Sequence, residues 1–388
     1  MKVAILSDAI SPFHQGGKET LHFERTTRLA GRGHEVRIFT MHWWQGRERE
    51  VIRDGVHLYA IGPRIPLYTR KGRRSIWQSV VFGLSTIRLI WAPAFDVLDV
   101  DQFPFSQFFV ARLVCSIRRK PMTATWHEVW DPTYWKHYMG WLGRIGVWLQ
   151  RSALRRADLV FANSALTASR LTSWMGVDQS RVLVLPPAGI ESLRLPTPTA
   201  GVSRTIDCIF IGRLLSHKHV DVLVRALATL PGVSGLIIGN GPERDRLQAL
   251  AGEFGIADRL RFETTSSHDA VIDRLRAARL FVSASTREGF GISVFEANAC
   301  GVPALVVRHP DNSALEMVRD GKNGLVCDLD AEAIAERIGA YLADPAMQVR
   351  MSRAAEKAAA AYSWESHVSR MVAALESLQA SRVRSLPG

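Results

Sequence analysis

The fold of this 388-residue chain is decided by one late stretch, Arg287-Glu288-Gly289-Phe290-Gly291-Ile292-Ser293-Val294-Phe295-Glu296-Ala297. It follows an apolar run at 280–283 that predicts a buried strand, and it opens a helical run. Gly289 and Gly291 leave backbone N–H groups unobstructed at the positive end of the helix dipole, which is typical of a phosphate-binding turn. Glu288 at the mouth and Glu296 about one turn into the helix offer acceptors for hydroxyl groups. The pattern suits a ligand with a phosphate between two hydroxyl-bearing ends, such as a nucleotide sugar.

Short apolar runs alternate with helical patterns along the whole chain, which predicts two parallel sheets, each covered by helices on both faces. The expected strands are 3–6, 36–40, 56–61, 97–100, 122–126 and 159–162 in the first half, and 206–211, 236–238, 260–262, 280–283, 304–307 and 325–327 in the second. Ligands of such sheets bind at the carboxyl ends of the strands.

A linker separates the two halves. Pro186-Pro187 and the Pro-rich run at 195–201 break the alternation, which then restarts. We therefore predict an α/β protein with two Rossmann-like domains facing each other across a cleft. The first spans residues 1–190 and the second residues 191–362.

Composition narrows the class of partner. The chain is 47% hydrophobic and 22% charged, with a net charge of +12, which suits nucleic acid, an anionic membrane surface or a polyphosphate substrate. Neither a zinc-ligand cluster nor an RNA-binding signature is visible, so we expect no nucleic-acid partner. Four scattered cysteines, a direct start into a strand without a signal peptide, and a longest apolar stretch too short to span a bilayer indicate a cytoplasmic protein.

Further turns at strand ends carry groups that bind anions. Arg213 and Lys218 flank the turn after the strand at 206–211, where both reach one diphosphate. Asn240-Gly241 follows the next strand, and Gly16-Gly17 follows the first strand of the chain. Gly16-Gly17 is either a second anion-facing turn or a plain flexible loop.

Taken together, these segments resemble the retaining glycosyltransferases of family four, which have the GT-B architecture of two Rossmann domains. Glu288 and Glu296 match the E-x7-E signature of that family, and Arg213 and Lys218 match its G-R-x4-K phosphate-binding segment. The Gly-Asn-Gly-Pro turn at 239–242 matches a turn near the nucleotide. His127, at the end of a strand, matches the family's histidine at the sugar-transfer centre. The resemblance covers most of the chain and is most specific at 206–330.

The resemblance implies the fold and the mechanism. The final helix, at 363–388, crosses back to the first domain, Glu296 holds the ribose, Glu288 holds sugar hydroxyls and His127 orients the sugar, with retention of anomeric configuration. The chain departs from the family pattern at 311–314, where a Gly-Gly pair is usual, and at 263–267, where a glycine is usual. Both departures leave the base and the sugar undetermined.

The resulting prediction is an enzyme that moves a sugar from a nucleoside-diphosphate sugar to a glycan or lipid-linked acceptor. The predicted catalytic residues are His127, Glu288, Arg213 and Lys218. The predicted donor-binding residues are Gly16, Gly17, Arg213, Lys218, Asn240, Gly241, Glu288, Gly289, Phe290, Gly291 and Glu296. Two alternatives remain, a nucleotide-sugar epimerase on the same fold and a non-catalytic nucleotide-sugar or glycan-binding protein.

We expect neither a metal nor another cofactor. Asp99-Val100-Asp101 is a literal D-x-D, the metal-binding motif of the other glycosyltransferase fold. Here it ends a strand of the first domain, and the cations and helix ends of the donor site are able to neutralise a diphosphate.

Two aromatic-rich segments allow more than one interpretation. The basic cluster at 70–74 precedes an apolar stripe at helical spacing, formed by Ile76, Trp77, Val80, Val81, Leu84, Ile87 and Trp91. This stripe either lies on a cytoplasmic membrane face, making the protein peripheral, or packs on the first sheet. The aromatic residues between 126 and 148 either stack on sugars, shield a lipid chain or belong to the core.

Overall fold

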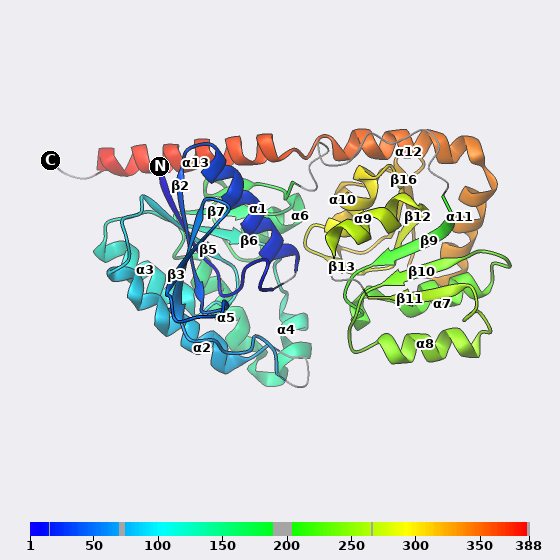
Figure 1. Ribbon diagram of the computed structural model, residues 1–388, viewed down its shortest axis with the longest axis horizontal. Helices are drawn as coiled ribbons and strands as arrows, with labels where there is room; N and C mark the ends of the chain where they lie inside the picture. The colour runs from blue at the N-terminus through cyan, green and yellow to red at the C-terminus, as the bar shows by residue number, and fades with distance from the viewer. Residues whose placement is uncertain (15, 70–73, 189–203, 265–266, 386–388) are drawn as a thin grey trace. The chain divides into compact units, whose positions relative to one another are not determined.

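The computed structural model describes residues 1–14, 16–69, 74–188, 204–264 and 267–385 (Figure 1). The chain divides into two compact units. Unit 1 consists of Met1–Pro187 together with Trp364–Gly388, and unit 2 consists of Ala188–Ser363. The chain thus leaves unit 1 after Pro186-Pro187 and returns to it at the last helix. The Pro-rich run at 195–201 lies outside the described residues.

Unit 1 is built on an eight-stranded sheet in the order β3-β4-β2-β1-β5-β6-β7-β8. Its strands are β1 (Lys2–Leu6), β2 (Glu35–Met41), β3 (Glu50–Arg53), β4 (Val56–Gly62), β5 (Val97–Asp101), β6 (Met122–Trp126), β7 (Leu159–Ala162) and β8 (Val182–Val184). All neighbours are parallel except β3 and β4. The six strands expected in this half are confirmed. Two further strands are not predicted by the sequence pattern: β3, which is charged and lies at the edge, and β8, which is only three residues long.

Seven helices lie within the described residues of unit 1. They are α1 (Gly17–Gly31), α2 (Ile76–Ser85), α3 (Gln107–Ile117), α4 (Pro132–Met139), α5 (Gly143–Leu154), α6 (Ala165–Ser173) and α13 (Trp364–Ser385), with the short turns η1 (Thr86–Ile90), η2 (Gly140–Leu142) and η3 (Gln179–Arg181). α13 packs against α1, and α2 packs against α3. Ser164 caps α6, because its hydroxyl accepts a hydrogen bond from the N–H of Thr167.

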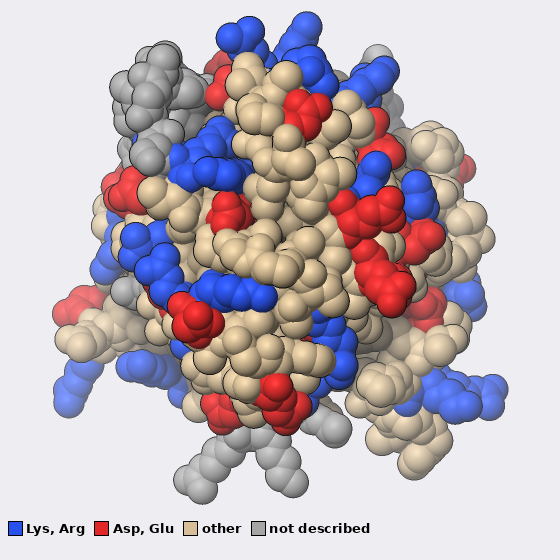
Figure 2. All heavy atoms as spheres, turned by 90° about the vertical axis from the view of Figure 1, so that its right-hand side faces the viewer, with Lys and Arg blue, Asp and Glu red and all other residues tan. Residues whose placement is uncertain are grey.

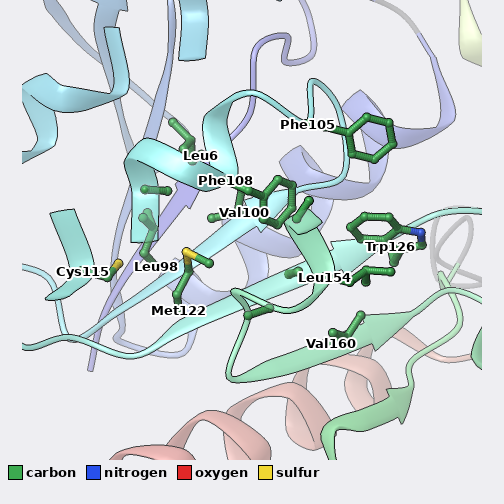
Figure 3. Close-up of a cluster of buried hydrophobic side chains, with 14 of the residues drawn as sticks. Leu6, Leu98, Val100, Phe105, Phe108, Cys115, Met122, Trp126, Leu154 and Val160 are labelled. Atoms are coloured by element: carbon green, nitrogen blue, oxygen red, sulfur yellow. The ribbon is translucent and has the colours of Figure 1, made fainter. Parts of the chain in front are cut away.

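The core of unit 1 lies between the central strands and the helices α2, α3 and α5 (Figure 3). Leu98 and Val100 of β5 and Met122 of β6 lie in one buried cluster with Phe108 of α3. Trp126, at the end of β6, has no exposed surface and packs against Phe105 and Phe108, so this tryptophan belongs to the core.

Unit 2 is built on a six-stranded parallel sheet in the order β11-β10-β9-β12-β14-β16. Its strands are β9 (Ile206–Ile211), β10 (Gly235–Ile238), β11 (Leu260–Glu263), β12 (Ala278–Ser283), β14 (Ala304–Val307) and β16 (Gly324–Cys327), with a separate pair β13 (Arg287–Glu288) and β15 (Asp311–Asn312). Its helices are α7 (Val220–Ala228), α8 (Arg244–Glu253), α9 (His268–Arg276), α10 (Ile292–Ala299), α11 (Ala331–Ala343) and α12 (Pro345–Ala359), with the turns η4 (Ser216–Lys218) and η5 (Ser313–Glu316).

Alternate residues of the unit 2 strands enter two different apolar cores. Leu280 and Val282 of β12 lie in one cluster, whereas Phe281 lies in the other. A sheet with apolar side chains on both faces needs helices on both faces. The expected α/β fold with two Rossmann-like units is therefore confirmed, as are all six strands expected in this half.

Most residues of the apolar stripe on α2 and the turn that follows it are exposed. Ile76, Trp77, Leu84 and Trp91 are 69%, 66%, 65% and 76% exposed, although Val81 and Ile87 pack against the core. Of the cluster at 70–74, only Arg74 lies within the described residues. The interpretation that this stripe packs on the sheet is therefore wrong for the outward residues, which leave an apolar surface exposed.

None of the helices in the described ranges is both long and apolar enough to cross a lipid bilayer. The four cysteines are buried and none of them forms a disulfide bond, and burial raises the pKa of Cys300 to about 12 and that of Cys327 to about 11. Such thiols are unreactive and serve as small apolar side chains.

Candidate active site

The turn that opens α10 requires glycine at one position. Gly291 caps the helix with φ +89°, and a Cβ there would lie 2.8 Å from the Cβ of Ala314. Only glycine satisfies both conditions at low cost. The ring of Phe290 is buried against Phe295 and Tyr362, so Phe290 faces a ligand through its main chain only.

Glu288 is held in place from both sides. Its main chain pairs β13 with β15, and its carbonyl accepts a hydrogen bond of 2.8 Å from the hydroxyl of Ser313. Its carboxylate receives the ammonium of Lys218 at 2.6 Å, with the two side chains 17% and 18% exposed. The segment at 311–314, which departs from the family pattern, therefore braces the main chain of Glu288.

Lys218 belongs to a loop that lies beside the α10 turn. The loop leaves β9, and the N–H of Thr286 donates to the carbonyl of His217 at 3.1 Å. Arg213 lies on the same loop with an exposed side chain. The structure thus brings Lys218 and Glu288 together, although they stand far apart in the sequence.

The turn at 239–241 packs directly on the same loop. A Cβ at Gly239 would lie 1.9 Å from the carbonyl oxygen of Gly212, and one at Gly241 would lie 2.3 Å from that of Leu214. The N–H of Leu214 donates to the carbonyl of Asn240 at 3.0 Å. Three loops that follow β9, β10 and β12 therefore meet at the carboxyl edge of the sheet, where parallel sheets bind ligands.

Glu296, one turn into α10, also has a basic partner. Its carboxylate lies 3.0 Å from Nε2 of His268, the first residue of α9. The side chain of Glu296 is 13% exposed and that of His268 is 55% exposed. Both glutamates of the E-x7-E spacing are thus positioned by a basic side chain from another element.

In unit 1, one face of α1 carries a basic stripe that faces two aspartates of β5. Lys18, His22 and Arg25 follow one another at helical spacing, and Asp99 and Asp101 follow one another at strand spacing. Lys18 Nζ lies 2.6 Å from Asp101 Oδ2, and Arg25 Nη1 lies 3.4 Å from Asp99 Oδ2 with both side chains fully buried. The D-x-D motif is therefore the acidic counterpart of this helix stripe.

The cluster continues to the end of β1. Asp8 receives Lys18 at 3.0 Å and is also paired with Arg74. Burial alone would raise the pKa of Asp8, but Arg74 and Lys18 hold it below its usual value. Burial likewise opposes ionisation of Asp101, and Lys18 and the neighbouring histidines hold its pKa well below the usual value. Burial lowers the pKa of His22, although the contact with Asp101 opposes this shift.

His127 is held by both ring nitrogens. Nε2 lies 2.7 Å from Asp101 Oδ1, and Nδ1 lies 2.7 Å from the amide nitrogen of Asn163. The amide of Asn163 donates to Nδ1, so the ring carries its proton on Nε2 and donates it to Asp101. His127 lies at the carboxyl edge of the unit 1 sheet, as expected.

His22, Asp101 and His127 together have the composition of a metal site, with one ligand atom from each within 4.8 Å of the others. Charge balance argues against a cation there. The three carboxylates of Asp8, Asp99 and Asp101 already face the three cations Lys18, Arg25 and Arg74. A divalent ion would place two unbalanced charges in a buried region, which is costly.

At the N-terminus of α1, the Glu19 carboxylate already lies where an anionic ligand would bind. Gly16 caps this helix, and a Cβ there would lie 2.4 Å from Oε2 of Glu19, so the Glu19 carboxylate folds back over Gly16. Gly16 and Gly17 therefore form a tight helix start, and an incoming phosphate at this point would have to displace Glu19.

Five residues of these two sites have no role predicted from the sequence, namely Lys18, His22, Arg25, Asn163 and His268. The stripe on α1 was detectable, because its three basic residues recur at the spacing of one helix face. The partners of Asn163 and His268 come from other elements, and no local pattern indicates them.

Two family models match the chain. The model described as "Glycosyl transferases group 1" matches residues 202–358, and that described as "Glycosyltransferase Family 4" matches residues 15–188. One match falls in each half of the chain, and residues 189–201, which follow the boundary between the units, lie between the two matches.

Among curated proteins, a D-inositol 3-phosphate glycosyltransferase of Acidothermus cellulolyticus is 29% identical, with 79% of this chain and 80% of that protein aligned. A GDP-mannose-dependent alpha-(1-6)-phosphatidylinositol monomannoside mannosyltransferase of Mycolicibacterium smegmatis is 36% identical over 50% of this chain and 56% of that protein. Among solved structures, a sucrose-phosphate synthase of Thermosynechococcus elongatus has the same fold, with a TM-score of 0.81 and 20% identity over 98% and 99% of the two chains.

Proposed function

This chain belongs to the group 1 glycosyltransferases and transfers a sugar from a nucleotide-sugar donor, and from that premise we propose which residues hold the donor and what accepts the sugar. The donor is a nucleoside-diphosphate sugar bound at the carboxyl edge of unit 2. The acceptor is a glycan or a lipid-linked molecule that meets unit 1. The epimerase and the non-catalytic interpretations are not favoured, because the named relatives are transferases.

The contact between Lys218 and Glu288 carries this proposal. It joins the loop after β9 to the turn that opens α10, within a region where glycines let backbone segments approach closely. The ammonium of Lys218 and the N-terminus of α10 therefore lie close together, and both attract the negative charge of a diphosphate. Arg213 on the same loop adds a planar guanidinium that is able to grip two phosphate oxygens.

In the reaction, the bond between the anomeric carbon and the diphosphate oxygen breaks, and the acceptor hydroxyl oxygen bonds to that carbon. The acceptor proton passes to the leaving diphosphate, so no separate base is required. Arg213, Lys218 and the α10 N-terminus stabilise the charge that develops on the leaving group. Glu288 holds sugar hydroxyls and Glu296 holds the ribose. Attack from the leaving-group face retains the anomeric configuration.

We propose that the reaction needs neither a metal nor another cofactor. The diphosphate charge is matched by Arg213, Lys218 and the helix dipole, and the D-x-D aspartates are matched by Lys18 and Arg25. A metal would therefore have no unbalanced negative charge to neutralise.

We also propose that unit 1 lies on an anionic membrane surface. Unit 1 holds 29 Lys and Arg against 16 Asp and Glu, whereas unit 2 holds 20 against 21, so the whole positive excess lies in unit 1. On the face drawn in Figure 2, Lys and Arg side chains are interspersed with Asp and Glu side chains. Concentrating the excess in one unit suits contact with an extended anionic partner.

The same unit presents an apolar face. It is formed by residues of α2, α3, α5 and the adjoining turns, namely Ile76, Trp77, Val80, Leu84, Trp91, Leu113, Ile117, Trp141, Ile145 and Trp148, each at least 40% exposed. α2 packs on α3, and Phe109 of α3 stacks on Trp148 of α5, so these helices adjoin. Exposed tryptophans beside basic residues are typical of a membrane interface, where a lipid-linked acceptor would be found.

A thermal-shift panel tests the donor site. UDP, GDP, ADP and dTDP, and GDP-mannose and UDP-glucose as sugar conjugates, are added to the wild type and to Arg213→Ala. One nucleoside diphosphate should raise the melting temperature by mass action, and the variant should lose most of that rise. Absence of any shift in the wild type would contradict the donor assignment.

Vesicle sedimentation tests the membrane surface. The full chain should bind vesicles that contain anionic lipid and bind neutral vesicles weakly, and Trp77→Ala should reduce the binding. Trp174→Ala is the matched control, because Trp174 is 42% exposed in unit 1 but lies outside the apolar face. Equal binding by both variants would contradict the assignment of this face.

A further inference from the structure

The second glutamate of the E-x7-E spacing receives a hydrogen bond from a residue outside that spacing. Nε2 of His268 lies 3.0 Å from Oε1 of Glu296. The two residues come from different helices, α9 and α10, which pack against each other. His268 stands in the first turn of α9, whose start is fixed by the Ser267 hydroxyl accepting from the N–H of Ala270.

The two ends of this contact have different environments. The Glu296 side chain is 13% exposed, so its carboxylate has lost most of its water and requires hydrogen-bond donors. The His268 side chain is 55% exposed and is not needed to fill the core. An ion pair with one exposed partner adds little to stability, because water competes with it. Loss of His268 should therefore leave unit 2 folded while removing a donor from a nearly buried carboxylate.

The contact also restricts the direction of the carboxylate. Glu has three side-chain torsions, and without a partner it samples several rotamers. A donor on Oε1 selects one of them and leaves the lone pairs of Oε2, and one of Oε1, open to the ligand. Two adjacent hydroxyls need a fixed pair of acceptors, so a carboxylate held in this way suits the vicinal diol of a ribose.

We propose that His268 is a positioning residue of the donor site, which orients Glu296 so that its carboxylate binds the ribose hydroxyls of the nucleotide. The inference rests on the proposed function, because it takes Glu296 as the ribose ligand. His268 touches neither the reacting carbon nor the diphosphate and acts only through Glu296. The structure thereby gives this chain a discriminator between ribonucleotides and 2′-deoxyribonucleotides.

The test compares nucleotides that differ by one hydroxyl. Calorimetric titration measures the binding of UDP, GDP and ADP, and of dUDP, dGDP and dADP, to the wild type, His268→Ala, His268→Gln and Glu296→Ala. Gln places an amide donor near the position of Nε2 and should rescue binding. Asp273→Ala is the control, because Asp273 is an exposed residue further along α9. Melting temperatures of all variants report folding separately.

We expect His268→Ala to weaken the binding of the preferred ribonucleotide about threefold to tenfold, the cost of leaving one flexible side chain to be ordered by the ligand. Binding of its 2′-deoxy counterpart should change less than twofold, and His268→Gln and Asp273→Ala should both bind like the wild type. In enzymatic assays His268→Ala should raise KM for the donor while kcat changes little.

Equal weakening of the ribonucleotide and the deoxyribonucleotide, or no weakening of either, would overturn the role of His268 while leaving the donor site intact. If the wild type bound none of the nucleotides, both the donor site and this role would be refuted. If Glu296→Ala left ribonucleotide binding unchanged while Arg213→Ala abolished it, the donor site would stand and the role of His268 would fall.

Discussion

Acidification should destabilise unit 1 through a single buried histidine, His367. This residue lies on α13 and joins three parts of unit 1. Its Nδ1–H donates to the carbonyl of Pro186 at 2.7 Å, and its Nε2 accepts from Nε–H of Arg25 at 3.1 Å. The ring is thus satisfied only in its neutral form, because a second proton on Nε2 would face the guanidinium of Arg25.

The sign of the effect follows from the direction of the pKa shift. Burial and the nearby charge of Arg25 lower the pKa of His367 from 6.5 to about 3, although the bond to Pro186 opposes this. Between these two values the unfolded chain binds a proton that the folded chain does not. The contribution of His367 is therefore complete above about pH 6.5 and is lost as the pH falls toward about 3.

The loss of stability due to His367 is already large between about pH 7 and about pH 5. Going from about pH 7 to about pH 5, the unfolded histidine becomes almost fully protonated while the folded one stays neutral. This lowers the free energy of unfolding by about 2 kcal/mol. For a unit of this size, about 2 kcal/mol corresponds to a fall of about 4–8 °C in melting temperature.

Tryptophan fluorescence is a selective assay, because all eleven tryptophans of the chain lie in unit 1. Melting curves are recorded from about pH 7 to about pH 5 for the wild type, His367→Gln and the control His137→Gln, whose histidine is exposed in the same unit. His367→Gln does not titrate, and it should start about 1–3 kcal/mol less stable because it satisfies only one of the two partners.

The melting temperature of His367→Gln relative to that of the wild type should then rise by about 4–8 °C as the pH falls, since all other titrating groups are common to both proteins. His137→Gln should follow the wild type in parallel. A constant gap between the wild type and His367→Gln would refute the reasoning, because it would mean that His367 has the same pKa in both states.

Three further predictions concern unit 2 and the reaction. Gly291→Ala should destabilise unit 2 by about 1–2 kcal/mol in calorimetry, because Gly291 has a positive φ. The control Gly252→Ala lies inside α8 with no atom near the added Cβ and should be neutral or stabilising. Equal effects of the two substitutions would contradict the strain at Gly291. Lys218→Ala should lower kcat/KM about 100-fold or more, and Lys218→Arg should lose less, because the charge on the leaving diphosphate stays partly matched; equal losses would point to shape instead of charge. EDTA should leave the initial rate unchanged, and a loss restored by a divalent cation would show that the charge balance argued for the two units is incomplete.

The strands were predictable because buried parallel strands are short continuous apolar runs. The runs at 206–211 and 280–283 became β9 and β12 with little change of boundary. β3 was not predictable in this way, because it is exposed at the sheet edge and carries Glu50 and Arg53. Its strand conformation comes from antiparallel pairing with β4, which is a tertiary effect.

The sequence predicts which loops form the site of unit 2, but not how their side chains contact one another. Glycines and charged residues directly after apolar runs marked the loops at 212–218, 239–241 and 287–291, and parallel strands bring such loops to one edge. The pairing of Lys218 with Glu288 was not visible, since it depends on how two loops fold against each other. Lys218 and Glu288 are both predicted to bind the donor, and in the structure they also bind each other.

The apolar stripe at 76–91 shows why amphipathic patterns leave the partner open. The sequence placed apolar residues around much of this helix, and the same pattern suits burial in a core or contact with lipid. Phe82 is fully buried, whereas Trp77 and Leu84 on the other side are mostly exposed. Which side faces the sheet depends on the packing of α2 against α3, and this is not encoded in the spacing.

The environment of His127 constrains how unit 1 takes part in the reaction. The ring proton on Nε2 is directed at Asp101, and the lone pair on Nδ1 is directed at Asn163. A hydrogen bond from this ring to a sugar hydroxyl therefore requires the exchange of one of these two partners. Asp101 is the costlier one to lose, because it also holds Lys18 and His22 within a buried, charge-balanced cluster. Exchange of the neutral Asn163 leaves that balance intact, and Nδ1 would then accept a hydrogen bond from the sugar while Nε2–H stays anchored on Asp101. If His127 serves the sugar as the resemblance implies, it does so as an acceptor whose orientation is set by Asp101.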